Sequence, residues 1–158
     1  MNINELLFLS GKWSGEGTAE FPSITTTDYK ETLLFEFDYT KDVISYHQKT
    51  KYAEQTRSKD TLHLESGFIK QTDDGSIELS NSQNNGRVEV LKLIKLTVDS
   101  GKTCALFSSK HIGNDPRMLN TQREYILDGD VLNYEMKMAT VDHSDLKTHL
   151  KAELKREV

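Results

Sequence analysis

The sequence predicts an all-β protein, an antiparallel barrel or sandwich, and three observations support this fold class. Apolar and polar residues alternate along most of the 158 residues, as they do in strands with one buried face. Only two prolines occur, and no linker, low-complexity segment or helical repeat interrupts the chain, so we expect one domain over residues 1–158. Turn signals separate the runs, namely "DDG" at 73–75, "NNG" at 84–86, "DSG" at 99–101 and "DGD" at 128–130.

The chain begins with a short helical turn, expected at residues 3–9, and continues into a glycine-rich strand. In "GKWSGEG", strand alternation places Gly11, Trp13, Gly15 and Gly17 on one face. Glycine contributes no packing to a strand, so this face indicates that something approaches the backbone closely. The glycines either relieve crowding at a barrel corner or admit a flat ligand, and Trp13 is expected in the floor of the barrel core.

Two later runs show the alternation most clearly. "TLLFEFDYT" places four aromatic or aliphatic side chains on one face, Leu33, Phe35, Phe37 and Tyr39. "VLNYEMKMA" does the same with Leu132, Tyr134, Met136 and Met138, and we expect the two methionines in the core. Similar short runs occur at 43–52, 60–70, 76–82, 87–98, 102–109 and 121–128.

The C-terminal run "DLKTHLKAELKRE" fits two kinds of element. Leu146, Leu150 and Leu154 lie at helical spacing, whereas Thr148, Leu150, Ala152 and Leu154 share one face of a strand. Periodicity alone does not decide between them. The all-β context favours a strand, because a barrel needs its last strand to pair with its first so that no edge stays open.

The composition excludes several classes of function. The net charge of −5 and a pI near 5.5 give no basic surface for nucleic acid or for a membrane. The single cysteine, Cys104, excludes a disulfide framework, and its apolar run "KTCALFSS" predicts a buried, inert thiol. The N-terminal apolar patch lacks the features of a signal peptide, and no run is long enough for a membrane span, so we expect a cytoplasmic protein.

Five short motifs resemble those of one known family, in the same order and at similar spacing. They are "GKWSGEG" at 11–17, "FPSI" at 21–24, "LHLESGFIK" at 62–70, "SNSQNNGRVEV" at 80–90, and "MAT" at 138–140 followed by "HLKAELKR" at 149–156. Through them the chain resembles the nitrobindin family, haem-binding β-barrels similar to fatty-acid-binding proteins. The C-terminal domain of one THAP-type zinc-finger protein belongs to the same family. The resemblance extends from Leu6 to Arg156.

The resemblance implies a ten-stranded antiparallel barrel of the lipocalin type that holds one haem b in its mouth. It implies His149 as the axial ligand of the haem iron and Ser23 as a haem-contacting hydroxyl. The distal-side neighbours that it implies are His63, Gln83 and Met138. Bacterial relatives use a basic haem contact near 110–120, where "KHIGNDPRMLN" gives no clean match.

The resemblance also implies an activity, the isomerisation of peroxynitrite to nitrate at a ferric haem, together with binding of nitric oxide. Haem and these small ligands are then the expected partners. The alternative is a haem-free carrier that holds a fatty acid or another small apolar ligand in the barrel cavity. Stoichiometric binding of haemin, or displacement of a fluorescent fatty acid, would discriminate between the two.

Without the resemblance, the titratable residues say little. A lone histidine such as His149 is more often structural than a metal ligand, and strict alternation places it opposite Leu150. A ligand at this position must therefore sit at the barrel rim or follow a β-bulge. His63 fits an ordinary polar face as well as a distal wall. We expect His47, His111 and His143 in solvent, and no hydrolase-like pair among Glu31, Glu65 and Glu89.

Overall fold

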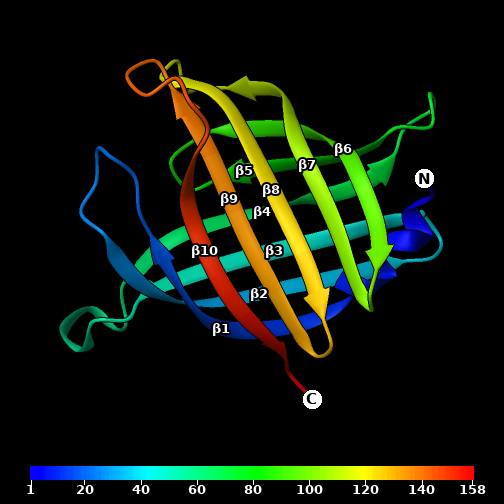
Figure 1. Ribbon diagram of the computed structural model, residues 1–158, viewed down its shortest axis with the longest axis horizontal. Coiled ribbons are helices and arrows are strands. Elements are labelled where there is room, and N and C mark those ends of the chain that lie inside the picture. Colours follow the sequence, from blue (N-terminus) through cyan, green and yellow to red (C-terminus); the bar gives the residue numbers. More distant parts are fainter.

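Ten antiparallel strands form one closed barrel in the computed structural model, which describes residues 1–158 (Figure 1). Each strand pairs with its neighbours in the chain, and β10 closes the barrel against β1. The predicted barrel and the predicted C-terminal strand are thus confirmed. The strands are β1 (Gly11–Ala19), β2 (Thr27–Asp38), β3 (Val43–Tyr52), β4 (Thr61–Gln71), β5 (Ile77–Gln83), β6 (Val88–Asp99), β7 (Lys102–Gly113), β8 (Met118–Asp128), β9 (Val131–Thr140) and β10 (Lys147–Arg156).

A 3-10 helix, η1 (Ile3–Leu9), precedes β1 and confirms the predicted helical turn. A capping box between Asn2 and Glu5 starts it: the Asn2 side chain accepts from the Asn4 N–H, and the Glu5 carboxylate accepts from the Asn2 N–H. Its apolar face, which includes Leu6, is buried in the barrel core. Trp13 is also fully buried, and its Nε1–H donates to the Leu9 carbonyl at 2.8 Å. The helix therefore closes one end of the barrel.

The chain itself occupies the bare face of β1. A Cβ atom at Gly15 would collide with the Glu153 carbonyl of β10, and one at Gly17 would lie 2.6 Å from the Tyr29 hydroxyl oxygen. The glycines thus let β1 pass close to β10 and to the Tyr29 ring, which favours the barrel-corner interpretation.

The inner faces of the strands build the core as the alternation predicts, with some exceptions. Leu33 and Phe35 are buried, and so are all four apolar residues predicted on β9. Tyr39 is 72% exposed, because β2 ends at Asp38 and the following residue lies in the turn. Cys104 is only partly buried; its thiol donates to a Glu124 carboxylate oxygen at 3.3 Å, and burial raises its pKa to about 11, so the thiol stays protonated at neutral pH.

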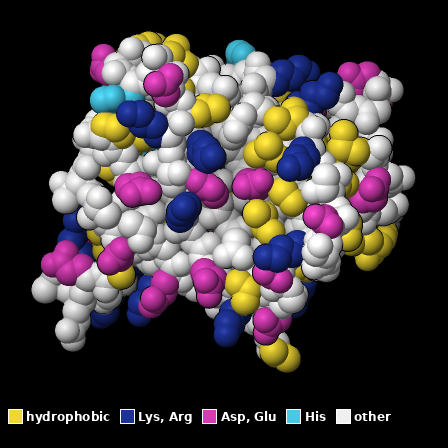
Figure 2. Space-filling model, viewed as in Figure 1, with side chains coloured by type: hydrophobic (Ala, Val, Ile, Leu, Met, Phe, Trp, Pro, Cys, Tyr) yellow, Lys and Arg dark blue, Asp and Glu magenta, His cyan; other side chains and the backbone are white.

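The outer surface carries both signs of charge. Figure 2 shows Lys and Arg side chains interspersed with Asp and Glu over the face formed by β8, β9 and β10. The second helical segment, η2 (Gln55–Arg57), is a single turn between β3 and β4. No helix of the structure has the length and apolar character needed to cross a membrane.

Candidate functional site

A cavity of about 520 Å³ lies inside the barrel, at the end away from η1. The loops β1–β2, β3–β4 and β9–β10 all lie at that end (Figure 1). Side chains from the strands and from these loops form its wall. The five side chains that the resemblance implies all line it, namely Ser23, His63, Gln83, Met138 and His149.

A β-bulge in β10 directs His149 into the cavity. The register against β9 shifts between Thr148 and Leu150, so His149 escapes the strict alternation that would place it outside. Its Nδ1 lies 3.0 Å from the Glu20 carbonyl oxygen, and the Glu20 N–H donates to the His149 carbonyl at 2.7 Å. Because a carbonyl only accepts, Nδ1 carries the proton and Nε2 keeps a free lone pair. Burial lowers the pKa of His149, which favours this neutral form.

A second imidazole, that of His143, packs against the same aromatic ring as His149. The Phe21 ring packs edge-on against His149 at 6.0 Å and against His143 at 5.5 Å between ring centroids. His143 lines the cavity and is partly buried, so its expected placement in solvent is wrong. The β9–β10 loop folds back through a hydrogen bond from the Thr140 N–H to the His143 carbonyl, 2.8 Å, and thereby brings this histidine to the mouth. His47 and His111 are exposed, as expected.

His63 and Gln83 line the cavity, and one polar atom of each side chain is hydrogen bonded to a neighbouring residue. His63 Nε2 lies 3.2 Å from a Glu65 carboxylate oxygen and donates to it, which leaves Nδ1 free. The buried Gln83 donates from Nε2 to the Asn81 side-chain oxygen at 3.2 Å, and no protein group hydrogen bonds to its own Oε1. Ser23 is exposed on the β1–β2 loop and contributes only at the rim.

A buried charged network lies beneath these side chains. Arg123 forms ion pairs with both carboxylate oxygens of Glu65 and, at 2.8 Å, with Glu89. Burial alone would raise the pKa of Glu65, but Arg123 and His63 lower it to about 2. Sequence analysis missed this network. Alternation does place Arg123 on the same face as the buried Tyr125, but which charges meet across a barrel depends on its closure.

Two arginines supply positive charge at the cavity. Arg117 lines it and pairs with Asp115 at 3.0 Å, with most of its own side chain exposed. Arg87, from the β5–β6 turn, also lines the cavity, and only 9% of its side chain is exposed. Its Nη1 lies 3.5 Å from a carboxylate oxygen of Asp115. Lys110 lies on the outer surface, paired with Glu78 at 2.7 Å, and does not reach the cavity. Sequence analysis did not single out Arg87.

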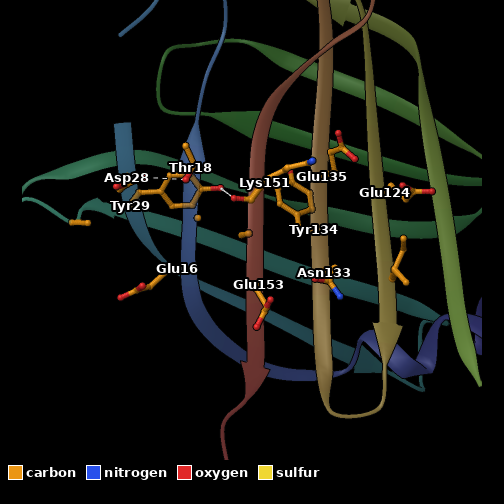
Figure 3. A pocket seen from close by; sticks show the side chains of 14 residues that line it. Glu16, Thr18, Asp28, Tyr29, Glu124, Asn133, Tyr134, Glu135, Lys151 and Glu153 are labelled. Atoms are coloured by element: carbon orange, nitrogen blue, oxygen red, sulfur yellow. Dashed lines mark hydrogen bonds between the residues drawn. The ribbon is translucent and has the colours of Figure 1, made fainter. Parts of the chain in front are cut away.

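A second hollow, of about 640 Å³, lies over β1, β9 and β10 on the outer side of the barrel (Figure 3). Its walls combine exposed polar side chains such as Glu16 and Glu153 with the buried rings of Tyr29 and Tyr134, and it contains no histidine. Figure 3 shows the Tyr29 ring reaching past β1 toward the Lys151 carbonyl, to which its hydroxyl donates at 3.4 Å. Its charged side chains are all exposed or half-buried, and it offers no arginine, whereas the inner cavity is lined by histidines, arginines and a buried carboxylate. The inner cavity is therefore the candidate site.

Comparisons with known proteins identify the family to which the chain belongs. The family described as "THAP4-like, heme-binding beta-barrel domain" matches residues 2–156. A protein of Arabidopsis thaliana named peroxynitrite isomerase Rv2717c is 35% identical over 150 residues, 95% of this chain and 86% of that protein. One of Nocardia farcinica named peroxynitrite isomerase is 29% identical over 159 residues, 99% of this chain and 91% of that protein. The crystal structure of Rv2717c from M. tuberculosis matches with a TM-score of 0.85 at 26% identity, over 99% of this chain and 97% of that one.

Proposed function

The chain belongs to the family of THAP4-like, haem-binding β-barrel domains, and from this premise we propose that it binds one haem b in the cavity and isomerises peroxynitrite to nitrate there. We further propose that His149 is the axial ligand of the iron and that nitric oxide binds at the same centre. The observation that carries the proposal is the fixed tautomer of His149, whose free Nε2 belongs to a side chain that lines the cavity.

The residues present fit a haem. The cavity volume of about 520 Å³ is in the usual range of cofactor sites. Its walls include Leu62, Met136 and Met138, which suit the apolar face of a porphyrin. Arg87 and Arg117 are the cations available to the haem carboxylates, since a guanidinium binds carboxylates well. Arg117 comes from the 110–120 segment, and Arg87 is a second candidate for the basic haem contact, from outside that segment.

The protein contributes a histidine that is held in one orientation, a partly apolar cavity wall and polar side chains. A bound haem b supplies a Lewis-acidic iron with a position open to nitric oxide or peroxynitrite. The Glu20 carbonyl holds the His149 ring, so Nε2 needs no reorientation. His63 is oriented by Glu65, and its free Nδ1 is available to hydrogen bond a small ligand. Apolar side chains such as Met138 form part of the cavity wall and lower its polarity around a bound ligand.

A haemin titration of the purified protein, followed by Soret absorbance, tests the haem site. We expect a saturable one-to-one band in the wild type and its loss or blue shift in His149→Ala. His143→Ala is the matched control, because His143 flanks the same Phe21 ring and should leave the band in place. If His143→Ala lost the band and His149→Ala kept it, the iron ligand would be His143, and the proposed role of His149 would be wrong.

The activity has its own test. Ferric haem-loaded protein should speed the decay of peroxynitrite and raise the yield of nitrate, while the haem-free protein should do neither. Unchanged decay with the loaded protein would remove the enzymatic part of the proposal. Displacement of a fluorescent fatty acid, with no Soret band, would instead support the haem-free carrier, which the apolar wall of the cavity also suits.

A further inference from the structure

Three carboxyl groups point inward beneath the cavity, and only two of them are neutralised. Arg123 pairs with Glu65 and Glu89, and Arg87 lies 3.4 Å from Glu89. Glu65 and Glu89 therefore each have a guanidinium partner, and Arg87 is shared between Glu89 and Asp115. The third carboxyl, Glu31 on β2, forms an ion pair with neither arginine.

Glu31 is nearly inaccessible to solvent, with 2% of its surface exposed. Its Oε1 accepts a hydrogen bond of 2.6 Å from the Gln48 amide, and no protein group hydrogen bonds to Oε2. Burial raises the pKa of Glu31 to about 7, although the Gln48 hydrogen bond and the more distant Arg123 oppose this shift. Both forms of the carboxyl are therefore populated near neutral pH.

Few charged groups face Glu31 from the strands around it. From β4 and β8 come Glu65 and Arg123, which neutralise each other. The tyrosines that sense its charge are Tyr29 on β2, Tyr125 on β8 and Tyr134 on β9, and burial raises the pKa of each well above its usual value. The partner residue on β1 is Gly15, and β3 presents the amide of Gln48. A charge on Glu31 thus has no ion-pair partner, and the Gln48 amide, Arg123 and the Tyr29 hydroxyl stabilise it only in part.

Side chains with hydroxyl groups lie near Glu31 and also line the cavity. Thr50 on β3 lies directly opposite Glu31 in the strand register. Tyr29 lies two residues before Glu31 on β2 and therefore on the same face. Both residues line the cavity, as does Tyr134. The buried hydroxyl oxygens of Thr50 and Tyr134 have no protein partner, so they are available to relay a proton between the cavity and the carboxyl.

We propose that Glu31 is a proton-exchanging site below the cavity, which takes up a proton when an anionic ligand binds above it and releases that proton when the ligand leaves. The proposal rests on the proposed function for the identity of the anion. Its physical basis is that a negative charge in the cavity disfavours a second negative charge nearby that has no ion-pair partner. By reciprocity, the protein with protonated Glu31 binds an anion more tightly.

Infrared difference spectroscopy of the haem-free protein tests the proton site. We expect the carbonyl stretch of a protonated carboxyl to disappear on raising the pH, with a midpoint near 7. Glu31→Gln should lack this band. Glu36→Gln is the matched control, since Glu36 lies on the same strand but is exposed, and it should keep the band. A band that persists in Glu31→Gln, or no titration near neutral pH, would overturn the assignment.

The linkage is tested in the ferric haem-loaded protein with azide as the anionic probe. Azide should raise the midpoint of the carboxyl band by about one pH unit, which corresponds to about tenfold tighter azide binding by the protonated form. The part of the pH dependence of azide affinity that arises from protonation of Glu31 should be absent in Glu31→Gln. An unmoved midpoint would overturn the linkage. A missing Soret band would overturn the proposed function and the anion linkage together, while the titration of the haem-free protein would still decide the proton site.

Discussion

Glu31 should make the fold less stable as the pH rises. Its pKa is raised from 4.5 to about 7 by burial, so the folded protein binds more protons than the unfolded chain between these values. The free energy of unfolding therefore falls as the pH rises from about 4.5 through 7, and the full loss persists above 7. A shift of this size corresponds to about 3 kcal/mol.

Chemical denaturation of the haem-free wild type and of Glu31→Gln, from pH 5 to pH 8.5, would measure this loss. The variant cannot ionise at this position, so its stability relative to the wild type should increase by about 2.5 kcal/mol across the range, since part of the loss already occurs below pH 5. The exposed control Glu36→Gln should follow the wild type throughout. Parallel curves for the wild type and Glu31→Gln would show that the carboxyl does not titrate with a raised pKa.

At the scale of single residues, the sequence predicts positions in the site better than it predicts their partners. Alternation alone indicates that His149 needs a bulge or a rim position, and the β10 bulge is present. The resemblance selects five side chains that line one cavity, while their roles remain proposals. The ion pair between Arg123 and Glu65 joins residues 58 positions apart, and no local pattern encodes such a pairing.

The seam between β1 and β10 depends on the absence of a side chain at Gly15. A Cβ there would meet the Glu153 carbonyl of β10, which is backbone and cannot rotate away. We predict that Gly15→Ala lowers the free energy of unfolding by about 2–3 kcal/mol, because overpacking forces the two strands apart. The neighbouring exposed Glu16→Ala is the control and should change it by no more than about 0.5 kcal/mol. Equal melting temperatures for both variants would contradict a tight seam.

At the scale of elements, alternation and turn signals predict most strands. The elements that they leave undecided are decided by tertiary pairing. The turn "NNG" gives Gly86 a φ of 90° between β5 and β6, as the signal predicts. The run from 147 to 156 fits a helix or a strand by periodicity, and its pairing with β1 selects the strand. Tyr39 continues the alternation of β2 in sequence, although the strand ends before it. The count of ten strands comes from the resemblance.

The whole molecule separates its stabilising and its functional ends. At one end, η1 and the fully buried Trp13 close the barrel with apolar contacts. At the other end, the cavity is lined by histidines, arginines and methionines. The buried layer around Arg123 and Glu31 lies between them. This arrangement lets the cavity carry polar groups without loss of the core that holds the strands together.

Substitutions at the two ends should therefore act independently. Leu6→Ala removes a fully buried side chain of η1, and we predict a loss of about 2–5 kcal/mol in the free energy of unfolding of the haem-free protein. Haemin affinity should stay within the ~0.5 kcal/mol expected of uncoupled sites. His149→Ala should do the reverse, abolishing the Soret band at a cost of no more than about 1 kcal/mol in stability.

The double variant Leu6→Ala/His149→Ala decides whether the ends are separate. Unfolding must be measured without haem, because a bound ligand would add its own stabilisation and couple the two effects artificially. If the ends are independent, the stability losses of the single variants add within about 0.5 kcal/mol. A larger deviation would mean that the closed end and the cavity respond to each other through the intervening layer of Arg123 and Glu31, and that the layer transmits strain rather than insulating the site.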